Sequence, residues 1–412
     1  MVAKKTFPRP NFLMIKLSIQ RSNRFSLAAS VLVTATLVSL GSQTFFSGSG
    51  PAFAAGPETS LKKWRVSTIA GARAYKELRY GDAERSFKKA IEEAKKFGPD
   101  DLRLASSLSN LGVLYNFRGF FDKAEPLFEE SVRIKEKKLG LANNDVISSQ
   151  GKLCQFYLRR GKFDKAEPLA NRVIAYGGKR VQDLKALKTK HKPDSKELRK
   201  ELNQFLELAV LFDRMALASM GHSQNGRYRQ SEELYKLSMQ LRENALSGNH
   251  LALAESYENL GKLYLKEKRY KLAEPLLKKA YRTSKSTLGF ANPKTYSKLD
   301  AWSQSLSGLG RSSQAESNYK LALQSFKEAY GANSGYVSNI ETALAHTMAN
   351  RGSYSAASVH LKRALAIQKR LRGPDHAITA AVRNEYIAML RKARRNDEAN
   401  RLKASSSTVD EI

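Results

Sequence analysis

The sequence of 412 residues contains a single cysteine, Cys154. One cysteine excludes an intramolecular disulfide framework, so the fold cannot depend on such cross-links. For the same reason, cysteine usage does not indicate whether the protein works in an oxidising compartment.

Motifs typical of enzymes are also missing. The sequence has no phosphate-cradling glycine loop, no G-x-S-x-G elbow and no H-E-x-x-H zinc motif. Its six histidines are not spaced as metal ligands on one helix. Adjacent acids such as Glu92 and Glu93 stand among lysines, which is typical of a solvated helix face. The sequence therefore predicts no enzyme, no metal and no cofactor.

Only one stretch, residues 25–40, is apolar over a length that approaches a membrane span. It follows a basic segment and precedes PAFAA at 51–55, where a signal peptidase would find an A-x-A site. The stretch is shorter than the roughly 20 residues that a transmembrane helix needs. We therefore expect residues 1–54 to be a signal peptide cleaved after Ala54, with export to the periplasm, cell envelope or medium. The alternative is an uncleaved N-terminal membrane anchor.

Beyond this segment the chain repeats itself with a period of 42 residues. Each unit predicts two helices, because apolar residues recur at helical spacing on both sides of a short turn. A second marker, a glycine near the end of the second helix, has the same period and suggests a left-handed C-terminal cap. The turn positions are Gly119, Gly161, Gly226, Lys268, Gly310, Gly352 and Arg394, and the second marker is Gly289, Gly331 and Gly373.

The turn is followed by an aromatic residue and, three times, by Ala-Glu-Pro-Leu, at 124–127, 166–169 and 273–276. In the 161–169 copy we expect Asp164 and Glu167 to form a capping box. We also expect Pro168 to lie in the first turn, where a missing amide costs nothing. Cys154 occupies a position that holds glycine or another small residue in the other units. We therefore expect a buried, inert thiol at a close contact between helices.

The Leu-Gly-x-x-Tyr spacing at 111–115 and 260–264, the following aromatic residue and the alanine resemble the tetratricopeptide repeat. The 42-residue unit and the AEPL turn are similar to its kinesin light chain variety. The resemblance implies an all-α fold, a right-handed α-solenoid of antiparallel helix pairs with a concave groove that binds peptides. We expect this array over 60–176 (repeats 1–3) and 206–404 (repeats 4–7 and a half-repeat). A basic helical insertion at 177–205 would separate the two parts, and a polar tail would follow at 405–412.

The resemblance also implies which residues line the groove. Asn110 and Asn259 match the family's groove asparagine, whose amide can both donate to and accept from the backbone of an extended peptide. Lys152, Arg159, Lys262 and Lys266 are suited to acidic side chains or a terminal carboxylate, and Gln155 stands beside them. Further groove positions by alignment are Val113, Glu258, Asp300, Gln304, Thr342 and His346. At Asp213, Ala216 and Met220 the sequence departs from the groove pattern.

Acidic residues are few: 39 Asp and Glu stand against 71 Lys and Arg, which gives a formal net charge of +32. Such a chain attracts anionic partners in a salt-dependent way. The leading hypothesis is nevertheless a non-enzymatic scaffold that binds proteins or peptides, including acidic segments, and can self-associate. The alternative is a binder of polyanions: nucleic acid, anionic lipid or acidic cell-wall polymer. Nucleic acid is disfavoured, because the aromatics occupy packing positions. Membrane contact is expected only through an uncleaved N-terminal segment.

Overall fold

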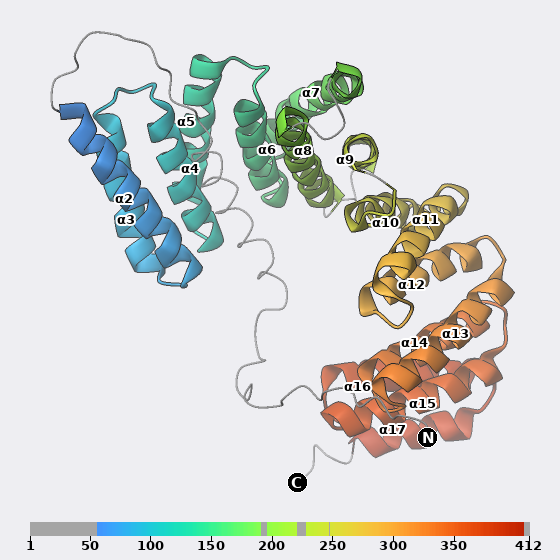
Figure 1. Ribbon diagram of the computed structural model, residues 1–412. Helices are drawn as coiled ribbons and strands as arrows, with labels where there is room; N and C mark the ends of the chain where they lie inside the picture. Colours follow the sequence, from blue (N-terminus) through green and yellow to red (C-terminus); the bar gives the residue numbers. More distant parts are fainter. Residues whose placement is uncertain (1–55, 191–195, 221–227, 247, 408–412) are drawn as a thin grey trace, which may run out of the picture. The chain divides into compact units, whose positions relative to one another are not determined.

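The computed structural model describes residues 56–190, 196–220, 228–246 and 248–407, and Figure 1 shows their arrangement. All regular structure in these ranges is helical and forms 16 helices. Successive helices pair in antiparallel fashion, so the prediction of an all-α array of helix pairs is confirmed. None of the described helices is long and apolar enough to span a bilayer. Residues 1–54, which carry the predicted signal peptide, lie outside the described residues.

The chain divides into two compact units, residues 1–140 and 141–412. Unit 1 contains two helix pairs, and its core gathers around the buried Trp64, whose Nε1 donates to Ser107 Oγ at 2.9 Å. In this unit we call α2 and α4 the first helices of their pairs and α3 and α5 the second. The helices are α2 (Gly56–Lys76), α3 (Tyr80–Lys95), α4 (Leu102–Phe117) and α5 (Phe121–Leu139).

Unit 2 contains the other helix pairs, in which even-numbered helices come first. Its first helices are α6 (Asn144–Arg159), α8 (Lys196–Met220), α10 (Leu251–Lys266), α12 (Pro293–Gly308), α14 (Gly335–Ala349) and α16 (Ala377–Lys392). Its second helices are α7 (Phe163–Lys190), α9 (Tyr228–Ala245), α11 (Tyr270–Leu288), α13 (Ser312–Tyr330), α15 (Tyr354–Arg372) and α17 (Asn396–Ser407).

The basic segment 177–205 lengthens two helices of unit 2. α7 has 28 residues, against 12 to 19 in the other second helices, and α8 has 25, against 15 to 21 in the other first helices. The two extensions flank residues 191–195, which lie outside the described residues. The α8 extension packs into the array through Leu198 and Phe205, which are both buried.

The small-residue position explains how closely the two helices of a pair approach. A Cβ built on Gly261 would lie 2.6 Å from Leu277 Cγ, and one on Gly71 would lie 2.6 Å from the Phe87 ring. Cys154 holds the same position in α6, is fully buried and donates its thiol to Ala166 O at 3.4 Å. The expectation of a buried cysteine at a close contact is therefore confirmed.

Turns between paired helices use the left-handed backbone region. Gly119 has φ 80°, and the non-glycine residue Lys268 has φ 57° at the equivalent turn. The glycines that end second helices also have positive φ, but their ψ lies far from the left-handed cap that we expected. Gly289, for example, has φ 84° and ψ 169°, a region that is essentially restricted to glycine.

The prolines of the Ala-Glu-Pro stretches lie further into their helices than expected. Pro126, Pro168 and Pro275 lie at the sixth position of their helices and not in the first turn. They therefore remove an intrahelical hydrogen bond, which their solvent-facing position tolerates. In α5 and α11, which carry the same motif as α7, no side chain caps the N-terminus.

A glutamate that directly follows the small residue near the start of a second helix joins successive pairs. Glu232 on α9 accepts hydrogen bonds from Tyr264 OH at 2.9 Å and Arg269 Nη1 at 2.6 Å. One period later, Glu274 accepts from Trp302 Nε1 at 3.0 Å. Glu316 follows after another period and pairs with Arg351 at 3.0 Å. In unit 1, Glu84 accepts from Tyr115 OH and Arg118 Nη1, both at 2.9 Å. We call these glutamates the inter-pair glutamates.

Candidate functional site

The first helices of unit 2 expose one polar residue at the same place in three successive pairs. Lys262, Gln304 and His346 each follow the small-residue position by one residue and lie exactly one period apart, on α10, α12 and α14. All three are exposed. α10 contacts α12, and α12 contacts α14, so these side chains belong to neighbouring helices. We call them the first-helix row.

An almost buried carboxylate supports the first member of the row. Glu258, which is 8% exposed, accepts from Lys262 Nζ at 2.5 Å and from Ser297 Oγ at 3.0 Å. The buried Lys298 on α12 pairs with its other oxygen at 2.7 Å. Burial alone would raise the pKa of Glu258, but the bonds from the two lysines outweigh it and lower the pKa. Lys262 is therefore oriented by an ion pair and still keeps a half-exposed side chain.

The second member is held by a carboxylate of a different kind. Gln304 Nε2 donates to Asp300 Oδ2 at 2.9 Å, and Tyr319 OH donates to Asp300 Oδ1 at 2.7 Å. Burial raises the pKa of Asp300, although the nearby charges of Lys262 and His346 oppose the shift. With its amide N–H committed to Asp300, Gln304 can offer its carbonyl oxygen and its second N–H to a ligand.

The third member reaches the next first helix. His346 Nε2 lies 3.1 Å from Glu385 Oε2 on α16, and both side chains are about half exposed. Thr342, one turn earlier on α14, donates to Ser338 O at 3.1 Å, so its hydroxyl is satisfied within the helix. The row therefore combines an ammonium, an amide and an imidazole, and each has a fixed acidic partner behind or beside it.

Asn259 and Asn110 lie two residues before the small-residue position, and both are half-buried. Neither amide makes a side-chain hydrogen bond to another described residue, so both retain their full donor and acceptor capacity. Asn259 lies in unit 2 beside Glu258. Asn110 lies in unit 1, on α4 with Val113, and is described there by itself. The structure thus brings Asn259 and Lys262 together with Glu258.

Lys152, Gln155 and Arg159 share one face of α6, which packs against α8. Asn144 Nδ2 donates to Gln204 Oε1 at 3.0 Å across this contact. Burial and the charge of Asp145 raise the pKa of Glu207 on α8, and Lys152 opposes the shift.

At the other end of this face, the charge of Arg159 acts on an arginine of α8. Burial lowers the pKa of Arg214 on α8, and the neighbouring charge of Arg159 lowers it further. Within the described residues, neither guanidinium pairs with a carboxylate. A half-buried arginine beside a second cation is unfavourable unless an anion joins them.

Two other expected positions have structural roles. Lys266 Nζ lies 5.7 Å from the centroid of the Tyr228 ring, a cation–π contact that leaves its side chain exposed. Asp213, where we expected the groove pattern to be interrupted, forms an ion pair at 2.5 Å with Arg242, whose side chain is 5% exposed. Arg242 also donates to Ser256 Oγ, so this network links α8, α9 and α10 in the interior.

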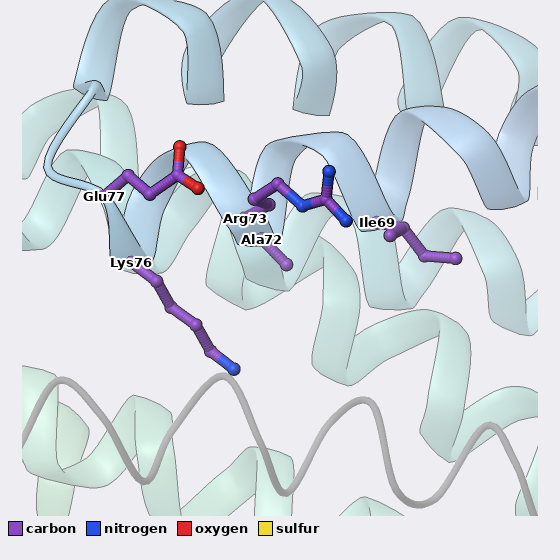
Figure 2. A pocket seen from close by; sticks show the side chains of 5 residues that line it. All are labelled: Ile69, Ala72, Arg73, Lys76 and Glu77. Carbon is purple, nitrogen blue, oxygen red and sulfur yellow. The ribbon is translucent and has the colours of Figure 1, made fainter.

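In unit 1, one pocket lies along a single face of α2 (Figure 2). Ile69 stands at the position that Asn110 holds in the next pair, two residues before the small-residue glycine, and is 54% exposed. The first-helix face of unit 1 therefore begins with an apolar residue. The pocket is lined by Ile69, Ala72, Arg73, Lys76 and Glu77.

Sequence reasoning did not identify Ser297, Lys298, Arg214 and Glu385 as part of these sites. Ser297 and Lys298 follow Glu258 by almost one period, so the repeat could have indicated them. Arg214 carried no such signal, because the long α7 and α8 shift the register between Gly161 and Gly226. No group of three or more His, Cys, Asp or Glu in the described ranges is arranged to hold a metal ion.

Comparison with protein-family models agrees with this architecture. One tetratricopeptide repeat model matches residues 68–137 and 215–286, and a second matches 342–378. The chain is a tetratricopeptide repeat protein. The matched ranges begin and end within the helix pairs of both units, and α10, with Asn259 and Lys262, lies inside one of them. A search of curated proteins by sequence finds no match.

Several solved tetratricopeptide-like structures are similar to the chain. BtubC (BKLC) from P. vanneervenii is 21% identical, with a TM-score of 0.41, and covers 57% of this chain and 92% of its own. A putative kinesin light chain from Podosopora anserina is 16% identical, with a TM-score of 0.43, and covers 56% and 98%. PilF of Pseudomonas aeruginosa is 14% identical, with a TM-score of 0.40, and covers 69% and 98%. The family assignment rests on the repeat models and on the helix pairs.

Proposed function

We propose that this tetratricopeptide repeat protein is a non-enzymatic scaffold that binds an extended segment of another protein along its first-helix face. One observation carries the proposal: the first-helix row of Lys262, Gln304 and His346 recurs at the repeat period and is exposed. Packing does not require polar residues there, because the neighbouring small-residue position makes the contact with the second helix. Tetratricopeptide repeat proteins generally bind other proteins and generally lack enzymatic activity.

The chemistry of the row suits a peptide backbone. Asn259 and Lys262 on α10 and Gln304 on α12 offer hydrogen-bond donors on neighbouring first helices. The two amides also offer acceptors. Glu258 holds Lys262, and Asp300 holds Gln304 and Tyr319, so both carboxylates are already hydrogen-bonded. A bound segment would therefore meet oriented donors at little further entropic cost.

The α6–α8 face supports an acidic group in the ligand. The charge of Arg159 acts on Arg214, and neither guanidinium has a carboxylate partner among the described residues. An aspartate, glutamate or terminal carboxylate of the ligand would relieve their repulsion and form charge-assisted hydrogen bonds.

The proposal is tested with a peptide selected from a random library on the purified protein. Replacing Asn259 and Gln304 together by Ala should weaken its binding at least tenfold, since two hydrogen bonds of about 1 kcal/mol each are lost. The matched control replaces Gln314 and Ser317 on α13, two exposed polar residues of a second helix, and should leave Kd unchanged. Equal losses in both variants would contradict the proposal.

Salt distinguishes peptide binding from the polyanion alternative. Binding through phosphate-type contacts falls steeply, by orders of magnitude between 50 and 200 mM salt when about six or more contacts are made. Binding of the selected peptide should change far less over that range. A peptide affinity that collapses with salt, and that heparin abolishes, would favour the alternative.

We also propose export, with cleavage after Ala54, on the strength of the basic segment, the apolar stretch and the A-x-A site. N-terminal sequencing of the protein from cells should begin at Ala55. A chain that retains residues 1–54 in a membrane fraction would favour the anchored form, and a full-length chain in the cytoplasm would contradict export.

A further inference from the structure

α15 differs from the other second helices in its charge. Its 19 residues contain Lys362, Arg363, Lys369, Arg370 and Arg372 and no acidic residue. The second helix α3, by contrast, combines its basic residues with Asp82, Glu84, Glu92 and Glu93. Residues 354–404 as a whole contain twelve Lys and Arg and only four acids.

The cations of α15 lie on its exposed side. Val359, Arg363, Ala366 and Arg370 recur at helical spacing and form one stripe, and all four are exposed. Lys362 and Lys369 flank the stripe and are exposed as well. The opposite side of the helix is buried in the core through Ala357, Leu361, Ala364 and Leu365. We call the exposed set of Val359, Lys362, Arg363, Ala366, Lys369 and Arg370 the cationic face.

These cations are not used within the fold. Among the described residues, Lys362, Arg363, Lys369 and Arg370 form no ion pair. The charge of Lys362 helps to lower the pKa of Glu398, but the main partner of Glu398 is Arg395. In unit 1, by contrast, Arg79, Arg118, Arg133 and Lys137 each pair with a carboxylate. His360, also on α15, points to the buried Glu341, at 2.5 Å.

We propose that the cationic face docks on an anionic lipid surface. Lysine and arginine on one side of a helix are attracted to acidic headgroups, and the attraction falls off within a Debye length, about 8 Å at physiological ionic strength. Val359, 45% exposed, lies within the face, and Leu371, 48% exposed, lies at its end. Exposed aliphatic residues beside cations suit a headgroup layer, which they can enter.

A single-stranded nucleic acid fits this face less well. Its binding sites combine cations with exposed aromatic rings on which bases stack. α15 has one aromatic residue, Tyr354, which is half-buried under Lys392. The proposal differs from the prediction that membrane contact is confined to residues 1–54, because it places a membrane contact on the folded array.

The test uses the full chain and vesicles of phosphatidylcholine with or without phosphatidylglycerol. Because Cys154 is buried, a cysteine introduced by Val359→Cys can be labelled selectively with an environment-sensitive dye. Its emission should shift to the blue with anionic vesicles and not with neutral ones, and the shift should vanish at high salt. A label at Leu321→Cys, on the exposed side of α13, should not respond.

A charge variant tests the same face by binding. Neutralising Lys362, Arg363, Lys369 and Arg370 to Gln should lower the partition coefficient on anionic vesicles by about 100-fold or more. The control neutralises Lys123, Arg133, Lys137 and Lys138 of α5, which removes the same charge elsewhere. Equal losses in both variants, a label that does not respond, or a label that responds to RNA but not to vesicles would each overturn the proposal.

Discussion

At the scale of single residues, the repeat is defined by the side-chain sizes that its packed positions exclude. The small-residue position tolerates Gly261, Cys154 or Ser303 because a second-helix side chain lies directly opposite. These identities were predictable from the sequence, since the period placed a small residue at each equivalent position. The identities of the exposed residues in the first-helix row could not be predicted in this way, because the fold places few steric demands on an exposed side chain.

Replacing Gly261 by Ala tests the close contact. The new methyl group would lie 2.6 Å from Leu277 Cγ, so the helices must separate. We expect a loss of about 1–3 kcal/mol in the free energy of unfolding, measured by urea denaturation.

Gly178→Ala provides the matched control for this prediction. Gly178 lies inside α7 with no atom within 4 Å of the added Cβ, so alanine should be neutral or stabilise by up to about 1 kcal/mol. If both substitutions stabilise the protein alike, the close contact does not exist in solution.

At the scale of elements, the inter-pair glutamates connect the second helices α3, α9, α11 and α13 to the following pair. Although burial acts to raise it, the pKa of Glu232 is lowered to about 2 by hydrogen bonds from Arg269, Lys236 and Tyr264. A carboxylate with a lowered pKa stabilises the fold above its unfolded-state pKa, and this contribution is lost as the pH falls through the folded value.

Glu232→Gln should therefore lower the thermal midpoint at pH 7. The difference from the unmodified protein should shrink as the pH falls from about 4.5 and disappear near pH 2. The control, Glu233→Gln, removes a carboxylate whose partner Arg229 is 90% exposed, and its effect should be small at every pH. A Glu232→Gln defect that persists unchanged at pH 2 would contradict the role of the charge.

The elements also show where sequence-based prediction stops. Second helices begin at the aromatic residues Phe121, Phe163 and Tyr270, so the prolines of the motif lie beyond the first turn, whereas we expected Pro168 in the first turn. Of the glutamates in the AEPL motif, Glu274 bonds to the next pair through Trp302, which the sequence did not indicate. The period shows which residues are equivalent, but a bond across some 30 residues depends on the angle between helices.

The candidate site follows the same division. The resemblance implied that Asn259 and Lys262 are groove residues, and they lie three residues apart on α10. The sequence did not predict that Lys262 shares Glu258 with Lys298, or that the charge of Arg159 acts on Arg214. Both depend on contacts between first helices, and the second depends on the lengthened α7 and α8 as well.

At the scale of the whole molecule, neighbouring helix pairs within each unit are held together by contacts between their helices. Such a protein should lose structure locally when an end is removed. Deleting residues 377–412 would uncover Leu361 and Leu365, which pack with α16 residues such as Leu390.

This deletion should lower hydrogen-exchange protection in α14 and α15 and leave α2–α5 unchanged. Loss of protection throughout the chain would show that the array unfolds as one cooperative unit, contrary to this account. The matched comparison is the same measurement on the full chain, with exchange followed separately for each helix.

The basic residues also differ in whether they form ion pairs within the fold. Many cations of unit 1 are paired with acids, whereas those on the exposed side of α15 are not. The composition alone predicted attraction to anions but not its location. The proposed peptide site and the cationic face lie on different helices, so the two proposals can be tested separately.

The most direct test of the central claim is site-specific photo-crosslinking to the selected peptide. A photoreactive amino acid in place of Gln304, on the first-helix face, should cross-link the peptide, and excess unlabelled peptide should prevent it. The same amino acid in place of Gln314, exposed on the second helix of the same pair, should not. Cross-linking from position 314 and not from 304 would contradict binding along the first-helix face.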